Sequence, residues 1–328
     1  MRRVVVTGLG IVSSIGNNAN EVQSSLYDAK SGISFSNSFA EHGFRCQVWG
    51  APTLDPSAMI DRRAMRFLSQ GAAWNHVAMD QAIADAGLSE SDITNERTGI
   101  VMGSGGPSTR TIVEAAETTL KNGSPKRIGP FAVPKAMSST ASATLATWFK
   151  IHGVNYSISS ACSTSAHCIG NAYELIQWGK QDMMFAGGHE DLDWTMSDLF
   201  DAMGAMSSKF NDKASAASRA YDVNRDGFVI AGGAGVLVLE ELEHAKRAAP
   251  RSMPRSSATA PPPTATTWLL LREKARCAAC GRRLPRCLRQ STTSTRTAPR
   301  RRSAIPRRWA PSARCSATRC RSSPRPSR

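Results

Sequence analysis

One cysteine stands among small residues in segment 157–167, which reads Ser-Ile-Ser-Ser-Ala-Cys-Ser-Thr-Ser-Ala-His. An extended, alternating run (154–158) precedes Cys162, and a helix-like run (163–178) follows it. We therefore place Cys162 on a sharp turn at a helix N-terminus, where backbone N–H groups and the helix dipole favour the nucleophilic thiolate. Small neighbours let a carbonyl group approach the sulfur and those N–H groups together, as acyl transfer requires. The alternative is an inert core thiol, the commoner role of an isolated cysteine.

Helices and strands alternate along the part of the chain that must position this cysteine. We predict strands at 3–7, 99–103, 155–159, 183–187 and 235–240, and helices at 17–29, 65–86, 108–121, 138–150 and 163–178. This alternation predicts an α/β fold with a largely parallel sheet. His167 follows Cys162 by five residues, about 140° around a helix, so we expect it to be packed or hydrogen-bonded rather than to reach the thiol.

The cysteine segment closely resembles the active-site segment of the β-ketoacyl-[acyl-carrier-protein] synthases, in particular the type I bacterial condensing enzymes of fatty acid synthesis. The resemblance is continuous from Met1 to about Ala245. Further motifs occur in the family's order: 5–16 (VVTGLGIVSSIG), 103–106 (GSGG), 135–139 (KAMSS), 185–188 (FAGG), 200–204 (FDAMG) and 221–232 (YDVNRDGFVIAG).

This resemblance implies a thiolase-like fold, in which two similar βαβαβ halves stack in layers of helix and sheet, and it implies a homodimer. It also implies the reaction. An acyl chain moves from acyl carrier protein to the cysteine, malonyl-loaded carrier protein loses CO₂, and the resulting carbanion attacks the thioester. Cys162 matches the nucleophile, and Ala161 and Phe200 match positions near the nucleophile and the acyl chain. The resemblance implies neither a cofactor nor a metal.

Three arginines, Arg62, Arg63 and Arg66, recur at i, i+1 and i+4, a spacing that puts Arg62 and Arg66 on one helical face. By itself this spacing is typical of a solvated helix surface. The resemblance gives these arginines, together with Lys126, the role of the basic patch that attracts the acidic carrier protein.

Composition changes abruptly after residue 246. Residues 247–328 hold 20 of the arginines and one acidic residue, Glu273, so the whole net charge of +15 comes from this tail. Its apolar residues follow neither helix nor strand periodicity, and we expect it to be disordered. We therefore expect residues 1–246 to form the N-terminal half of the thiolase-like domain, and the tail at 247–328 to stand where the second half belongs.

The tail has the composition of GC-rich coding DNA read out of frame. Segment 291–303 is compatible with codons that, in a neighbouring frame, encode the family's first histidine motif. We infer a one-nucleotide frameshift between codons 243 and 254, which resequencing of the gene would test. The family's two histidines and lysine come from its second half and are absent from this chain. We therefore expect condensation to be lost or impaired, and the alternative is a remnant that binds carrier protein without condensing.

Other readings of the chain are weaker. An Arg-rich arm binds phosphate, but only Trp268 and Trp309 interrupt this one with aromatic rings, so we predict no nucleic-acid partner. Cys277-x-x-Cys280 is half of a zinc site without a second pair. The run 222–233 begins like a calcium loop but ends in glycine where glutamate is needed. No apolar run is long enough to span a bilayer and no signal peptide is evident, so we predict a cytoplasmic protein with reduced thiols.

Overall fold

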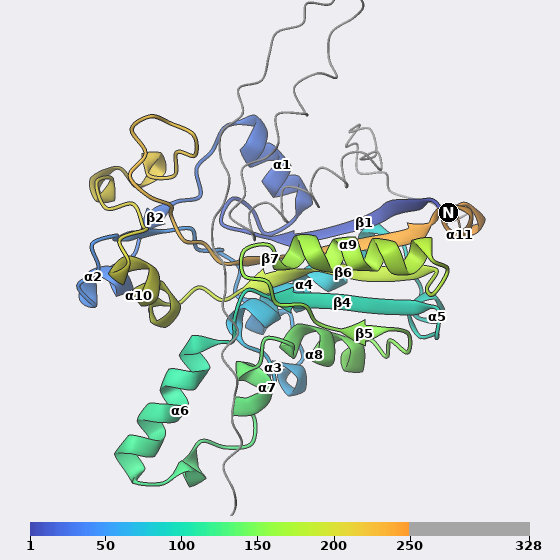
Figure 1. Ribbon diagram of the computed structural model, residues 1–328, viewed down its shortest axis with the longest axis horizontal. Coiled ribbons are helices and arrows are strands. Elements are labelled where there is room, and N and C mark those ends of the chain that lie inside the picture. The colour runs from blue at the N-terminus through green and yellow to red at the C-terminus, as the bar shows by residue number, and fades with distance from the viewer. Residues whose placement is uncertain (249–328) are drawn as a thin grey trace, which may run out of the picture. The chain divides into compact units, whose positions relative to one another are not determined.

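The computed structural model of the chain describes residues 1–248, and its centre is a five-stranded sheet in the order β1-β7-β6-β4-β5 (Figure 1). The strands are β1 (Val4–Val12), β4 (Thr98–Ser104), β5 (Asn155–Tyr156), β6 (Met183–Glu190) and β7 (Gly233–Glu241). β4 pairs in parallel with β5 and β6, whereas β7 lies antiparallel between β6 and β1. The α/β prediction is confirmed, and β7 is the strand that runs against the other four.

Helices and a small hairpin surround this sheet. The longer helices are α1 (Ala19–Tyr27), α4 (Gln70–Asp85), α6 (Thr109–Asn122), α8 (Thr140–Trp148), α9 (Thr164–Gln177) and α10 (Trp194–Ala202). The shorter ones are α2 (Asn37–Glu41), α3 (Arg62–Met65), α5 (Glu90–Ile93), α7 (Ala132–Ala136) and α11 (Leu242–Ala248), with 3-10 turns η1 (Pro56–Ala58), η2 (Pro125–Arg127) and η3 (Asn211–Ala216). The strands β2 (Ser34–Phe35) and β3 (Val48–Trp49) form the hairpin.

Each face of the central sheet has its own apolar core, because successive side chains of a strand point to opposite faces. Ile100, Met102 and Phe185 pack with α4 and α8 on one face. Val101 and Met184 pack with α9 on the other. Figure 1 shows α9 in front of the sheet and α4 behind it. The strands are therefore held between two helical layers, and α9 is fixed relative to the strand ends.

Two glycines of β1 allow α4 to cross the strand at close range. A Cβ atom on Gly10 would stand 1.7 Å from the carbonyl oxygen of Ala78, and one on Gly8 would stand 2.5 Å from that of Ala82. No side chain fits in either place. The Gly-x-Gly sequence within β1 thus serves helix packing.

Helix boundaries follow the capping residues more closely than the apolar pattern. Asn18 caps α1 and accepts a hydrogen bond from the backbone N–H of Glu21. The single helix predicted over 65–86 is wrong at its start. α3 ends at Met65, and α4 begins only after Ser69, which caps it by accepting from the backbone N–H of Ala72.

A third apolar cluster lies beside the sheet, around the β2–β3 hairpin, α10 and η3. Phe39 and Phe44 stack with ring centroids 4.7 Å apart, and Phe39 meets Trp49 edge to face at 5.3 Å. Phe200 of α10 packs against this cluster. The cluster therefore fixes α10 beside the carboxyl ends of the central strands.

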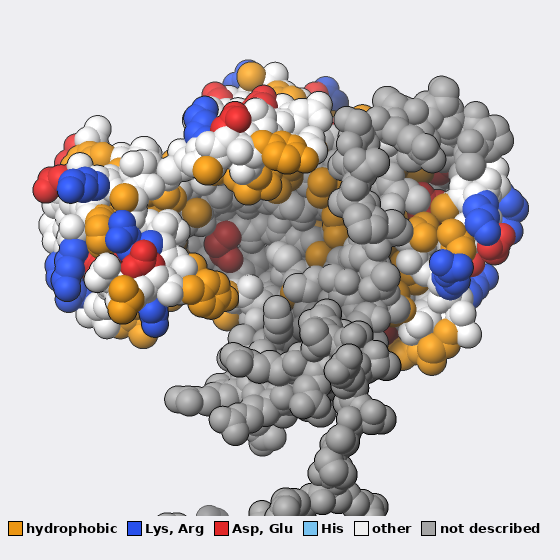
Figure 2. Space-filling view, turned by 90° about the horizontal axis from the view of Figure 1, so that it is seen from above, with side chains coloured by type: hydrophobic (Ala, Val, Ile, Leu, Met, Phe, Trp, Pro, Cys, Tyr) orange, Lys and Arg blue, Asp and Glu red, His pale blue; other side chains and the backbone are white. Residues whose placement is uncertain are grey.

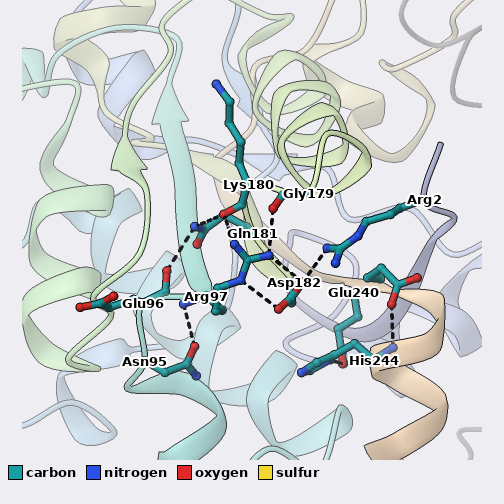
Figure 3. Close-up of polar contacts among 11 residues, drawn as sticks. Arg2, Asn95, Glu96, Arg97, Gly179, Lys180, Gln181, Asp182, Glu240 and His244 are labelled. Carbon is teal, nitrogen blue, oxygen red and sulfur yellow. Dashed lines mark hydrogen bonds and ion pairs between the residues drawn. The ribbon is translucent and has the colours of Figure 1, made fainter.

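A polar cluster ties together the opposite, amino-terminal ends of three strands (Figure 3). Arg97, just before β4, donates to both carboxylate oxygens of Asp182 at 3.0 and 2.9 Å, and Arg2, before β1, donates to the same group at 2.6 Å. The hydrogen bond from Arg97 is the largest cause that lowers the pKa of Asp182 to about 2. Because Asp182 directly precedes β6, the cluster fixes three strands at the end remote from Cys162.

The predictions about the tail, namely disorder and the zinc and nucleic-acid alternatives, concern residues outside the described ones. The last described helix, α11, runs two residues past the predicted boundary at 246. Within residues 1–248, no helix combines the length and the apolar character needed to cross a membrane.

Candidate functional site

Cys162 lies on a tight turn between β5 and α9, as predicted, and its side chain is exposed. Cys46 and Cys168, the other cysteines of the described part, are buried. Burial raises the pKa of Cys46, and it raises that of Cys168 to about 11, so both thiols stay protonated near neutral pH. Cys162 is therefore the thiol of residues 1–248 that a substrate can reach.

Thr164 holds the cysteine turn in place. Its hydroxyl accepts a hydrogen bond from the backbone N–H of Ser160 at 2.8 Å and donates to the carbonyl oxygen of Ala161 at 2.7 Å. Ala161 has a φ of 52°, a left-handed conformation that costs about 1–2 kcal/mol for a residue with a Cβ atom. The two hydrogen bonds offset that strain and turn Cys162 outward at the start of α9.

A cavity of about 690 Å³ opens in front of Cys162. Ala161, Cys162 and Phe200 all line it, so the structure brings the three predicted pocket residues together. Much of the remaining wall is apolar, and Phe200 meets Phe228 edge to face with centroids 5.4 Å apart. Figure 2 shows a hollow in this face of the molecule with an acidic side chain at its floor. The cavity thus combines a reachable thiol with apolar walls and a negative group.

The carboxyl end of β6 supplies the polar side of the cavity through His189, Glu190 and Asp191. Burial raises the pKa of Glu190 to about 7, against the hydrogen bond that its Oε2 accepts from the Gly105 N–H at 2.8 Å. Burial lowers the pKa of His189 to about 4, and its Nδ1 has no hydrogen-bond partner within residues 1–248. Asp191 accepts from the backbone N–H of Gly71 at 2.6 Å and so fixes the start of α4.

His167 is hydrogen-bonded to Ser160 rather than to Cys162. Its Nδ1 lies 2.6 Å from the hydroxyl oxygen of Ser160, which confirms the prediction that this histidine is hydrogen-bonded. The contact joins the first turns of α9 to the segment before the cysteine, and so it adds to the rigidity of the turn.

The four predicted basic residues, Arg62, Arg63, Arg66 and Lys126, are all exposed. Arg66 lies one residue past α3 in helical conformation, and Lys126 lies in the turn η2. Phe67, which follows Arg66, meets Phe131 edge to face at 5.1 Å. This contact ties the segment after α3 to the segment after η2, so the two sources of positive charge belong to connected parts of the surface.

Nothing in residues 1–248 groups three or more His, Cys, Asp or Glu side chains in a way that could hold a metal ion. The calcium-like run illustrates this. Asp226 accepts hydrogen bonds from the hydroxyl of Ser207 and the backbone N–H groups of Ser208 and Lys209. Its carboxylate therefore fixes the loop before β7.

Two residues of the site escaped the sequence reasoning. Glu190 lies three residues past the strand predicted at 183–187, and an acidic residue near the end of an apolar strand is the signal that indicates it. Thr164 lies inside the cysteine segment, but hydroxyl residues on both sides of it give no sign of which one would hold the turn.

The sequence of the chain is similar to those of several known proteins. The family described as "Beta-ketoacyl synthase, N-terminal domain" matches residues 1–245. The chain is 58% identical over 246 residues to 3-oxoacyl-[acyl-carrier-protein] synthase 1 of Escherichia coli (strain K12), which covers 75% of this chain and 61% of that protein. It is 55% identical over 245 residues to the Haemophilus influenzae protein of the same name, covering 75% and 60%.

Several solved structures also have folds similar to that of this chain. A β-ketoacyl synthase from Burkholderia phymatum STM815 superposes with a TM-score of 0.69 at 29% identity, covering 76% of this chain and 61% of that one. A type II PKS acyl-carrier protein in complex with its ketosynthase bound to a hexaketide gives 0.65 at 31% identity, covering 75% and 60%. The chain thus spans about three fifths of the length of the relatives that it matches.

Proposed function

The chain belongs to the β-ketoacyl synthase family, and on that premise we propose that Cys162 accepts an acyl group from acyl carrier protein in fatty acid biosynthesis. One observation carries this proposal: the reachable thiol of residues 1–248 stands at the start of a helix and opens into an apolar cavity. Relatives that are 58% and 55% identical are named 3-oxoacyl-[acyl-carrier-protein] synthase 1.

The acyl-transfer step is a thioester exchange. The Cys162 thiolate attacks the carbonyl carbon of the acyl thioester, and the negative charge moves to the carbonyl oxygen. The positive end of the helix dipole of α9 faces that charge. Collapse of the intermediate breaks the bond to the carrier thiolate, which takes up a proton from solvent, and the acyl group remains on Cys162. Ala161 leaves room for the carbonyl group, and Phe200 lies along the path of the chain.

We assign only this acyl-transfer half of the reaction to the described residues. Decarboxylation of malonyl-loaded carrier protein needs hydrogen-bond donors at the thioester oxygen. Residues 1–248 contribute one histidine, His189, to the cavity wall, whereas the family takes two histidines and a lysine from its second half. The alternative function, a remnant that binds carrier protein without chemistry, differs in one outcome, because it forms a complex but no acyl-enzyme.

For the partner, we propose that an acidic carrier protein docks on Arg62, Arg63, Arg66 and Lys126. Exposure of the four side chains and the contact between Phe67 and Phe131 support this. Steering by such charges speeds encounter and weakens as salt increases. A second copy of the chain is the other proposed partner. β5 has a neighbour only in β4 among the described strands, and an open strand edge is a template for pairing in a cytoplasmic homodimer.

The experiment that tests this function follows the transfer of a labelled acyl group from acyl carrier protein to the 328-residue chain. We expect stoichiometric transfer, its loss in Cys162→Ser, and a transfer rate that falls about tenfold in Arg62→Glu/Arg66→Glu at low salt. The charge reversals leave the thiol unchanged, so their reaction with a small uncharged acyl donor is the matched control. Binding of carrier protein without transfer would contradict the proposal and favour the remnant.

A further inference from the structure

Glu190 lies beside the peptide that precedes the reactive cysteine. A Cβ atom on Gly105 would stand 2.6 Å from Glu190 Oε2 and 3.4 Å from both the carbonyl carbon and the carbonyl oxygen of Ala161. Gly105 therefore lies between the carboxyl group and the Cys162 turn at this point. Glu190 also has the strand parity of Met184 and Ala186, which pack beneath α9, so its side chain lies on the face of the sheet that carries Cys162.

A short chain of hydrogen bonds connects the Glu190 carboxyl group to the segment that leads into Cys162. The Gly105 N–H donates to Glu190 Oε2 at 2.8 Å. The Ser159 hydroxyl lies 3.0 Å from the carbonyl oxygen of Ser104 and 3.3 Å from that of Gly105. Ser159 precedes the turn that Thr164 closes. The Glu190 carboxyl group thus holds the loop after β4, and that loop holds the segment that leads into Cys162.

The charges around this carboxyl group share one sign. The titratable side chains that line the cavity are Cys162, His189, Glu190 and Asp191, and no lysine or arginine of the described residues joins them. His189 comes from β6 itself, Cys162 from the start of α9, and Asp191 from the loop after β6. The adjoining parts of β1, β7, α10 and the loop after β4 contribute no ionisable group to the wall.

We propose that Glu190 is a positioning residue that makes the reactivity of Cys162 depend on a second proton. Its carboxyl group fixes the loop against the cysteine turn, and loss of its proton places a negative charge in the cavity that Cys162 also lines. Burial, helped by the charge of Asp191, raises the pKa of Glu190 to about 7, so this change falls in the neutral range. A neutral Glu190 leaves the thiolate unopposed, whereas an ionised Glu190 disfavours it.

The coupling between Glu190 and Cys162 bears on the proposed acyl transfer. The inference rests on that proposed function only for its biological use. Acylation converts the thiolate into a neutral thioester and removes the repulsion. Ionisation of Glu190 therefore favours the acylated over the free cysteine anion, and the carboxyl group loses a proton more readily once the acyl chain is loaded. Alkylation by iodoacetamide needs only the thiol, so it tests the coupling even if acyl transfer from carrier protein fails.

The test is the pH profile of Cys162 alkylation in the full chain. In the wild type we expect the logarithm of the rate to rise with a shoulder near pH 7 and with less than unit slope above it. Glu190→Gln keeps an oxygen for the Gly105 N–H but cannot ionise. It should react like the wild type at pH 6 and up to about tenfold faster around pH 8, the size expected for two nearby charges partly screened by solvent, and the two rates should converge at higher pH as both thiols ionise.

Asp191→Asn is the matched control, because it replaces another carboxylate of the same cavity with an amide. It should keep the shoulder and move it slightly to lower pH, since the Asp191 charge raises the pKa of Glu190. A wild-type profile that follows one ionisation with unit slope would overturn the proposal without any substitution. So would a folded Glu190→Gln protein whose rate ratio to the wild type does not change with pH.

Discussion

Replacing Thr164 with valine removes the hydroxyl that closes the Cys162 turn while keeping the shape of the side chain. Valine cannot accept from the Ser160 N–H or donate to the Ala161 carbonyl oxygen, which the hydroxyl does at 2.8 and 2.7 Å. Each lost hydrogen bond costs about 1 kcal/mol, and more where a backbone group is left unpaired. We expect Thr164→Val to lower the free energy of unfolding by about 2–3 kcal/mol.

The same substitution should slow the chemistry of the cysteine. Without its hydroxyl bracket, the left-handed backbone of Ala161 can relax, and Cys162 loses its fixed place at the start of α9. We expect the rate of Cys162 alkylation to fall several-fold at pH 7.5 under conditions where the protein stays folded. Urea unfolding monitored by tryptophan fluorescence gives the stability, and iodoacetamide kinetics give the reactivity.

Thr164→Ser separates the hydroxyl from the methyl group. Serine keeps both hydrogen bonds but lacks the methyl group. In threonine this methyl carbon lies 2.8 Å from the position that a Cβ atom on Gly103 would take, so it packs closely against that glycine. We expect a loss of about 0.8 kcal/mol, the value of one buried methylene, and an unchanged alkylation rate. If Thr164→Val matches the wild type within about 0.5 kcal/mol and reacts as fast, the hydroxyl does not hold the turn and the reasoning is refuted.

Two further predictions concern stability. The hydrogen bond that His244 donates to the Glu240 carboxylate raises the pKa of His244. The stability that this bond gives is present below the unfolded pKa of about 6.5 and is lost as pH rises through the folded value. Denaturant titrations from pH 5 to 9 should show this loss and His244→Gln should flatten it, whereas an unchanged slope in the variant would contradict the assignment. Gly10→Ala drives a Cβ atom into α4 and should lower the stability measured by thermal unfolding by about 1–3 kcal/mol or more. The matched control is Gly170→Ala in α9, where no described atom lies within 4 Å of the new Cβ, and it should raise the stability by about 0.5–1 kcal/mol. Similar effects at both sites would show that β1 and α4 are not in close contact.

Much of the fold could be predicted from local patterns. The alternating run before Cys162 and the helical run after it fixed the turn, and Asn18 marked the start of α1. The helix predicted over 65–86 failed because apolar periodicity continues through Phe67 and Leu68, where the chain leaves helical geometry before Ser69 caps α4. The direction of β7 escaped prediction because strand pairing depends on residues distant in sequence.

Some residues of the candidate site could be predicted from the sequence, and others could not. Cys162 is visible in sequence because its neighbours are small and its flanking elements are regular. The perturbed pKa of Glu190 is not, because it comes from burial among residues of β1, β7 and α10 that only the fold brings together. His189 lines the cavity for the same reason, and no motif in the sequence marks it.

The most direct test of the central claim is to locate the acyl group after transfer from acyl carrier protein. The chain is incubated with labelled acyl carrier protein, quenched in acid and digested, and the cysteine-containing peptides are measured by mass spectrometry. Cys162 and Cys168 fall in one peptide, so fragment ions between them assign the label. We predict that the acyl mass lies on Cys162, and on neither Cys168 nor the peptide that contains Cys46, both of which are buried. An acyl group on another residue, or none on a folded protein, would contradict the assignment of Cys162 as the acyl acceptor.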